Sequence, residues 1–382
     1  MKFKKWNIAF LGLVFAVLIV VACTNYFVDP FGYFTFQSGD YDDIDFPVDT
    51  SYMQRELKAE HVLHFSDNYD AYLLGGSKAG TYRPAKLQEL DGYRYYNMFE
   101  IGGSFYEYYL ETQFLLEHAN PKKIILSISG GEVRVEERDQ SDVTYQIPAI
   151  MSGESKFLEM FDFISKDIGE SLDRLKQRKE RESREKYYEM PSTGERNMEL
   201  YYERVETDWE NYTTRYVLEE FDQHMRTLFK APRRAPYIDE GLEYLRLIKE
   251  LCDENGVELL VIVSPAFIGD LSIFESIYYW EFLVDISMIT DYWDFSGYND
   301  IVLNPYNFYN EGHFYYETAD LVIDTINGTD SYPGFGVYVT RENVMEHVEQ
   351  RKADYERLQQ EYLETGTIQL QGMEDASCLL KN

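Results

Sequence analysis

The chain has 382 residues, of which 45% are apolar, which suits one α/β domain with a large insertion and excludes global disorder. Its formal net charge of −32 repels phosphate backbones, so we expect no nucleic-acid partner. The three cysteines are far apart and the six histidines are scattered, so we expect neither a metal site nor any other cofactor.

The N-terminus is typical of a membrane segment. Three lysines within the first five residues precede an uninterrupted apolar run over 8–23, and aromatic residues flank this run. The first interpretation is an uncleaved signal anchor over 1–23, with its basic end in the cytoplasm and the chain after about residue 24 outside the cell membrane. The second is a lipoprotein signal, because "VVAC" ends on Cys23 as a lipobox would. The third is a cleaved secretory peptide, for which an A-x-A site is missing.

Residues 24–68 are expected to be a loop-rich lead-in, after which strands and helices alternate. Apolar runs predict strands at 70–76, near 93–99 and at 122–133. Between the last two, the stretch "FYEYYLETQFLLEHANP" has apolar residues at helical spacing and ends before Pro121. This alternation with continuous apolar strands predicts an α/β fold with a parallel sheet covered on both faces.

Residues 154–235 interrupt the pattern with long, charged, amphipathic segments. These predict a helical insertion with solvated faces, and a lid or partner-binding role is the alternative. The α/β pattern resumes over 236–330 with a helix and a buried strand at 257–265, so the α/β domain is expected in two parts, 24–153 and 236–330. The tail, 331–382, contains a polar helix predicted from Arg341 to about Glu364.

Three successive predicted strands end in glycine pairs, at 75–76, 102–103 and 130–131, and Ser77 directly follows the first pair. Sites in parallel sheets form at the carboxyl ends of strands, and glycine lets backbone N–H groups converge on an oxyanion. Of the histidines, only His313 follows a loop after the last α/β elements, so it is the candidate base for Ser77. The alternative is that the glycines only turn the chain and that His313 is structural.

The stretches "YLLGGSKAG", "YNMFEIGGS" and "NEGHF" resemble, in this order, the first, second and last blocks of the SGNH/GDSL hydrolases. Together with the N-terminal anchor, "VDPFGYF", "NPKKIILSISGGE" and "ELLVIVSP", the layout resembles the membrane-anchored, extracytoplasmic members of that superfamily, the DltD-like and alginate O-acetylation-like proteins of bacterial envelope modification. The resemblance covers about 24–150 and 236–327 and leaves out the helical insertion. It implies a three-layer α/β/α sandwich with a parallel, flavodoxin-like sheet.

The resemblance also implies roles for individual residues. Ser77 would be the nucleophile and His313 the general base, and the backbone N–H groups of Ser77 and of Gly102 or Gly103 would form the oxyanion hole. The implied function is acyl transfer or ester hydrolysis on a cell-envelope glycopolymer, such as an envelope polysaccharide or a teichoic-acid-like polymer. The implied partner is a membrane-bound O-acyltransferase.

Two positions depart from the family pattern. The third block of the family carries an asparagine, whereas this chain has Gly130-Gly131-Glu132. Asn310 stands where the family has the triad aspartate, and an amide can orient the imidazole but supplies no charge. Three acidic residues could substitute for the missing carboxylate: Glu311, Asp291 and Asp294. The alternative function is therefore a noncatalytic envelope scaffold or polymer-binding protein with a degenerate triad, and a carboxylate at Nδ1 of His313 would favour the enzyme.

Overall fold

The structure, a computed structural model, describes residues 2–39, 53–133, 142–181, 192–199, 201–203, 238–268, 271, 279–310, 312–330, 332–366 and 368–370. The chain divides into two compact units. Unit 1 comprises Met1–Ser66 and Asp139–Ser192, and unit 2 comprises Asp67–Arg138 and Thr193–Asn382.

Unit 1 is helical in its described residues. Its first helix, α1 (Lys2–Phe27), is long and apolar enough over Phe3–Phe27 to cross a membrane, as the sequence predicts. The other helices are α2 (Tyr33–Ser38), α3 (Gln54–Phe65), α6 (Ala149–Ser152), α7 (Lys156–Ser165) and α8 (Ile168–Arg181). They enclose a small core of buried side chains: Phe31, Tyr33, Phe36, Met53, Leu57, Val143 and Phe163.

The prediction of a loop-rich lead-in over 24–68 was wrong at α3. This helix lacks the apolar stripe that marks an amphipathic helix, because it buries charged side chains, including Arg55 and Glu60, as well as apolar ones. The Arg55 guanidinium donates a hydrogen bond to the Thr144 carbonyl at 2.8 Å, and Lys156 forms an ion pair with Glu60. Two buried charges of α3, on Arg55 and Glu60, are therefore paired with groups of the loop before α6 and of α7.

Unit 2 is built on a six-stranded sheet with the order β2-β1-β3-β4-β5-β8. The strands are β1 (Ala71–Gly75), β2 (Tyr95–Asn97), β3 (Lys123–Ile128), β4 (Glu258–Val263), β5 (Tyr292–Asp294) and β8 (Val337–Val339). The first five are mutually parallel, with Leu74 paired with Leu126 between β1 and β3, and this part of the predicted parallel sheet is confirmed. The edge strand β8 runs antiparallel to β5, which the sequence analysis did not predict.

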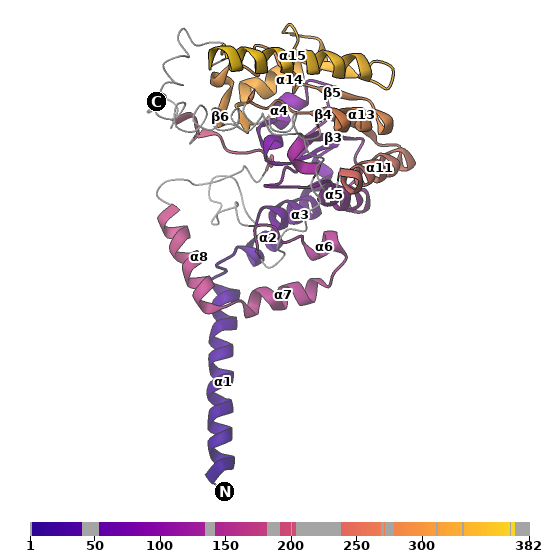
Figure 1. The fold of residues 1–382 in the computed structure, drawn as a ribbon. Coiled ribbons are helices and arrows are strands. Elements are labelled where there is room, and N and C mark those ends of the chain that lie inside the picture. Colours follow the sequence, from indigo (N-terminus) through magenta and orange to yellow (C-terminus); the bar gives the residue numbers. More distant parts are fainter. Residues whose placement is uncertain are drawn as a thin grey trace. The chain divides into compact units, whose positions relative to one another are not determined.

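Helices lie on both faces of this sheet. They are α4 (Pro84–Leu87), α5 (Phe105–His118), α11 (Ile238–Asn255), α13 (Tyr279–Ile289), α14 (Tyr316–Asn327) and α15 (Val344–Thr365). Figure 1 shows α4 packed with α14 on one side of the strands and α5 packed with α11 on the other. Every residue of β1 and β3 is buried as a result, which explains their continuous apolar sequences.

The predicted helical insertion over 154–235 is only partly described. Its first part forms α7 and α8 as expected, but residues 193–196 are not helical and belong to unit 2. The Asn97 N–H donates to the Thr193 carbonyl at 2.9 Å, and the Arg196 N–H donates to the Gly80 carbonyl at 2.8 Å. Residues 182–191 and 204–235 lie outside the described residues, and the predicted domain boundaries stay a prediction.

Candidate active site

Ser77 lies at the carboxyl end of the central strand β1, between β2 and β3. It opens a short 3₁₀ turn, Ser77–Thr81, directly after the two glycines that end the strand. Gly75 has a φ of +152°, and a Cβ there would lie 2.3 Å from the Ser127 carbonyl oxygen of β3. A Cβ on Gly76 would lie 2.2 Å from Oε1 of Glu132. Position 75 therefore requires glycine, whereas a side chain at position 76 would have to displace the Glu132 carboxylate. Ser77 follows at the point where the strand order of a doubly wound sheet reverses.

His313 comes from a small antiparallel hairpin of β6 (Phe308–Asn310) and β7 (His313–Phe314). Its Nε2 lies 2.7 Å from Oγ of Ser77, although 236 positions separate the two residues in the chain. The Tyr309 ring stacks on the imidazole at a centroid distance of 5.4 Å, and Phe314 is fully buried. The hairpin is thus held by aromatic packing, and it brings together the serine and histidine that the sequence analysis paired.

Asn310 contacts Nδ1 of His313, the ring nitrogen that does not face Ser77. Its Oδ1 accepts a hydrogen bond from the Gly312 N–H at 3.0 Å and lies 2.7 Å from Nδ1 of His313. Because that oxygen is an acceptor, Nδ1 carries the proton, and Nε2 presents its lone pair to the Ser77 hydroxyl. This tautomer is the one that a general base needs, so the amide supplies orientation without charge.

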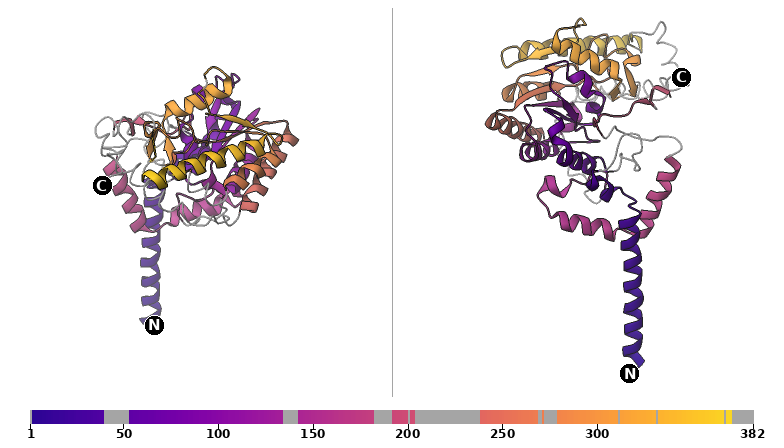
Figure 2. Two further views of the ribbon diagram at one scale, coloured as in Figure 1. Left: turned by 45° about the horizontal axis from the view of Figure 1, so that its top comes forward. Right: turned by 180° about the vertical axis from the view of Figure 1, so that it is seen from behind.

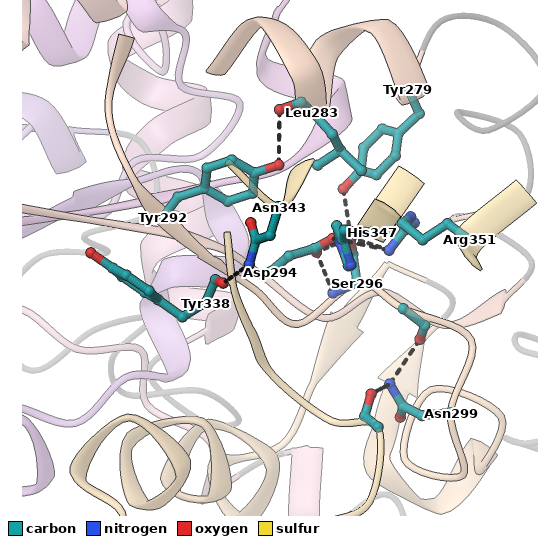
Figure 3. A network of polar contacts seen from close by, with 12 residues as sticks. Tyr279, Leu283, Tyr292, Asp294, Ser296, Asn299, Tyr338, Asn343, His347 and Arg351 are labelled. Carbon is teal, nitrogen blue, oxygen red and sulfur yellow. Dashed lines mark hydrogen bonds and ion pairs between the residues drawn. The ribbon is translucent and has the colours of Figure 1, made fainter. Parts of the chain in front are cut away.

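Neither candidate carboxylate in the described part of the chain replaces the amide. Asp294, at the end of β5, accepts hydrogen bonds from the Ser296 hydroxyl at 2.6 Å and from His347 at 2.7 Å, and it pairs with Arg351 at 3.1 Å (Figure 3). Asp291 accepts from the Tyr338 hydroxyl at 3.2 Å. The expectation that Asp291 or Asp294 could orient the base was wrong, because both serve other contacts. Glu311 lies outside the described residues.

Two cationic side chains influence His313. Burial, followed by the charges of Arg196 and Lys78, holds the pKa of His313 well below its usual range, so the imidazole is neutral at pH 7. The Arg196 guanidinium donates to the Tyr309 hydroxyl and lies 5.3 Å from the Phe99 ring centroid. Burial and these two charges therefore disfavour the imidazolium that forms when Nε2 takes the proton of the attacking hydroxyl.

The sequence analysis missed Arg196. It lies in "STGERNMEL", within the predicted helical insertion and outside the family resemblance, and no motif marks it. Its place depends on the backbone contact with Gly80 and on the Tyr316 hydroxyl, which donates to the Arg196 carbonyl. Lys78 was visible beside Ser77 in "GGSKAG", but a single lysine after a serine carries no specific signal.

The loops after β1 and β2 meet around the Tyr108 hydroxyl of α5. A Cβ on Gly103 would lie 2.7 Å from this oxygen, and one on Gly76 would lie 3.2 Å from it. The hydroxyl is buried and has no hydrogen-bond partner among the described residues. Gly102, with a φ of +62°, precedes Gly103 in the same loop. The two glycine pairs thus lie around one side chain, and the direction of their N–H groups toward Ser77 stays a prediction.

Glu132 occupies the third position of this arrangement. Its carboxyl group accepts from the Ser129 N–H at 2.8 Å and lies beside Gly76. Burial, followed by the charge of Glu132 and other acidic neighbours, holds the pKa of Tyr108 well above its usual range. Tyr108 therefore keeps its hydroxyl proton at neutral pH.

Among the described residues, no group of histidine, cysteine, aspartate and glutamate side chains has the arrangement of a metal site. No protein-family model matches the chain, and no curated protein matches its sequence. The geometry of the site therefore carries the functional argument.

Proposed function

We propose that the protein is an SGNH-type acyltransferase or esterase that acts outside the cell membrane on an envelope glycopolymer. One observation carries this proposal: the Ser77 hydroxyl lies 2.7 Å from Nε2 of His313, and Asn310 fixes the tautomer from the opposite side. The strand order β2-β1-β3-β4-β5 agrees with a flavodoxin-like, three-layer α/β/α sandwich, which is the fold that the resemblance implies.

In the proposed reaction, Oγ of Ser77 attacks the carbonyl carbon of an ester or thioester while Nε2 of His313 takes the hydroxyl proton. The tetrahedral intermediate collapses, the leaving group receives that proton, and an acyl-serine remains. A sugar or polyol hydroxyl, or water, then gives its proton to Nε2 as its oxygen attacks the acyl carbon, and Oγ of Ser77 leaves with that proton, which regenerates the enzyme. The oxyanion would be held by the N–H groups of Ser77 and of Gly102 or Gly103.

The cellular setting of the proposal follows from α1. The lysines at its start favour an N-terminus in the cytoplasm and a chain that lies outside after about residue 24, with Cys23 as the alternative, lipid-modified anchor. A membrane-bound O-acyltransferase is the proposed source of the acyl group. A polysaccharide or teichoic-acid-like polymer is the proposed acceptor. These partners come from the family resemblance alone.

A second candidate, a noncatalytic scaffold or polymer-binding protein, is favoured by one specific observation. Nδ1 of His313 meets an amide, and Arg196 and Lys78 further disfavour the imidazolium. In a serine triad, exchanging the aspartate for an amide costs about 10⁴ in rate, largely through the wrong tautomer. Here the tautomer is right, so the enzyme remains the better-supported function and a slow acylation step is expected.

Labelling with a serine-directed fluorophosphonate separates the two candidates. The full chain in detergent is treated with the probe, with Ser77→Ala as the test variant and Ser152→Ala, at an exposed position of unit 1, as the matched control. We expect the native chain and the control to be labelled and Ser77→Ala to remain unlabelled. Labelling that persists in Ser77→Ala excludes Ser77 as the nucleophile, and no labelling of the native chain favours the scaffold.

A further inference from the structure

Helix α7 in unit 1 exposes apolar side chains where a water-facing helix would expose polar ones. Phe157, Leu158 and Phe161 share one face, and their exposed fractions are 66%, 64% and 59%. The opposite face points into the unit: Glu159 accepts from the Tyr33 hydroxyl at 3.1 Å, and Phe163 stacks on the Tyr33 ring. Three large apolar side chains on one face of a ten-residue helix form a patch that marks an interaction surface.

The end of α1 fixes the position of this helix. Nδ2 of Asn25, a buried residue, donates to the carbonyls of Ile164 and Lys166 at 3.0 and 2.9 Å. Oδ1 of Asn25 accepts from the Ser171 hydroxyl at 2.7 Å, which ties the start of α8 to the same point. Figures 1 and 2 show α7 running across the end of α1 and not alongside it. The two helices are thus joined two residues before α1 ends.

The exposed surface of α1 is apolar along the candidate membrane span. Its side chains are exposed along the candidate span, with Phe15 at 64% and Val20 at 62%, and only lipid or another apolar protein surface could cover them. Trp6 and Tyr26 stand near the two ends, where aromatic side chains favour the membrane–water interface. Asn25 lies next to Tyr26, so α7 contacts α1 at the level of one membrane–water interface.

We infer that the face of α7 formed by Phe157, Leu158 and Phe161 inserts into the surface of the bilayer that α1 spans. Helices α1 and α7 are in direct contact, and the apolar face of α7 is the one turned away from Tyr33 and the core of unit 1, so the bilayer that surrounds α1 is the nearest apolar phase for this face. A short helix lying in the membrane plane buries its apolar face about 5–10 Å into the boundary between headgroups and acyl chains. This inference rests on the membrane span of α1 and is independent of the chemistry proposed for Ser77. A spanning helix with a second helix lying across it would fix the tilt of unit 1 against the membrane.

Site-directed spin labelling tests the inference on the full chain reconstituted in phosphatidylcholine vesicles. In a background of Cys23→Ser and Cys378→Ser, which leaves only the buried Cys252, a nitroxide is attached at Phe161→Cys. The matched control is Asp162→Cys, which lies beside it and is turned by about 100° around the helix. Power saturation then compares collisions with oxygen, which concentrates in the bilayer, and with a water-soluble nickel chelate.

We expect oxygen to relax the label at position 161 several-fold more than the nickel chelate does, and this excess to be smaller at position 162, which lies at the polar edge of the face, four residues after Leu158. Comparable access of the nickel chelate at both positions would overturn the inference, because the face would then lie in water. Shielding of position 161 from both reagents would overturn it too, since a second copy of the chain would then cover the face. Phe157→Cys repeats the test should Phe161→Cys fail to fold. A label at Val17→Cys in α1 that is not oxygen-accessible removes the membrane span on which the inference rests.

Discussion

The substitution Asn310→Asp places a carboxylate against Nδ1 of His313 with little change in shape. In the native chain the amide oxygen lies 2.7 Å from Nδ1 and holds the tautomer, so the substitution adds charge and leaves orientation as it is. The carboxylate stabilises the imidazolium that forms when Ser77 loses its proton. We therefore expect Asn310→Asp to accelerate the acylation of Ser77.

The size of the gain follows from the geometry. Opposite charges about 4 Å apart attract by about 4 kcal/mol at an effective dielectric constant of about 20, which corresponds to about 10³-fold in rate. Part of this is offset because the new carboxylate loses solvation in a half-buried site, so we expect a gain of about 10- to 10²-fold. The carboxylate also raises the pKa of His313, which burial, Arg196 and Lys78 hold low in the native chain. The acidic limb of the rate profile therefore moves to higher pH.

The second-order rate of fluorophosphonate labelling measures both effects without knowledge of the natural substrate. It is determined from about pH 4 to pH 9 for the native chain, for Asn310→Asp and for the matched control Asn304→Asp. Asn304 caps a turn before the hairpin through its contact with the Tyr306 N–H, so the control carries the same charge change away from Nδ1. An unchanged rate and an unchanged acidic limb in Asn310→Asp would refute the proposed contact between Asn310 and the base.

Three further predictions concern stability. The pKa of His61 is lowered to about 3 by burial and that of His313 is also lowered, so the unfolded chain binds more protons below its histidine pKa of about 6.5. The free energy of unfolding should therefore fall between pH 6.5 and pH 5 by up to about 1.4 kcal/mol per pH unit for each histidine. Denaturant titrations at several pH values should show a weaker dependence of the unfolding free energy on pH in His313→Gln. Asp294→Asn removes the ion pair of the buried Arg351 and should lower the free energy of unfolding by about 3 kcal/mol in a denaturant titration. The rate of fluorophosphonate labelling at Ser77 should stay the same, and its collapse would contradict the separation of the Asp294 contacts from the site. Gly75→Ala forces a Cβ against the backbone of β3 and should lower the free energy of unfolding by about 1–3 kcal/mol in the same titration. Gly297→Ala, where a Cβ would make only ordinary contacts, should lower it less. Equal losses in the two variants would contradict the steric account of the end of β1.

The sequence predicted those parts of unit 2 whose pattern reflects burial. The strands β1, β3 and β4 are continuous apolar runs because helices cover both faces of the sheet, and α5 and α11 show helical spacing. The pairing of Ser77 with His313 could be predicted because Ser77 directly follows a parallel strand, where sites form, and because His313 alone among the histidines follows a loop after the last α/β elements. The antiparallel strand β8 could not, since three residues on an edge depend on the neighbouring strand β5 and carry little pattern of their own.

The remaining differences arise where tertiary contacts override local pattern. Helix α3 buries charged residues whose partners come from distant segments, such as Lys156 for Glu60, so no apolar stripe marks it. Arg196 reaches the site from a polar segment through single backbone contacts. Asp294 was a reasonable candidate by its place at a strand end, but α15 supplies the partners that occupy it.

Trapping the acyl-enzyme tests the central claim most directly. The full chain is mixed with an excess of a p-nitrophenyl ester, and released nitrophenol and acylated peptides are measured on the same samples. We predict release of nitrophenol, with the acyl group on the peptide that contains Ser77, and loss of both in Ser77→Ala and His313→Gln. A chain that releases no nitrophenol, or one acylated at another residue, would contradict the assignment of Ser77 and His313 as nucleophile and base.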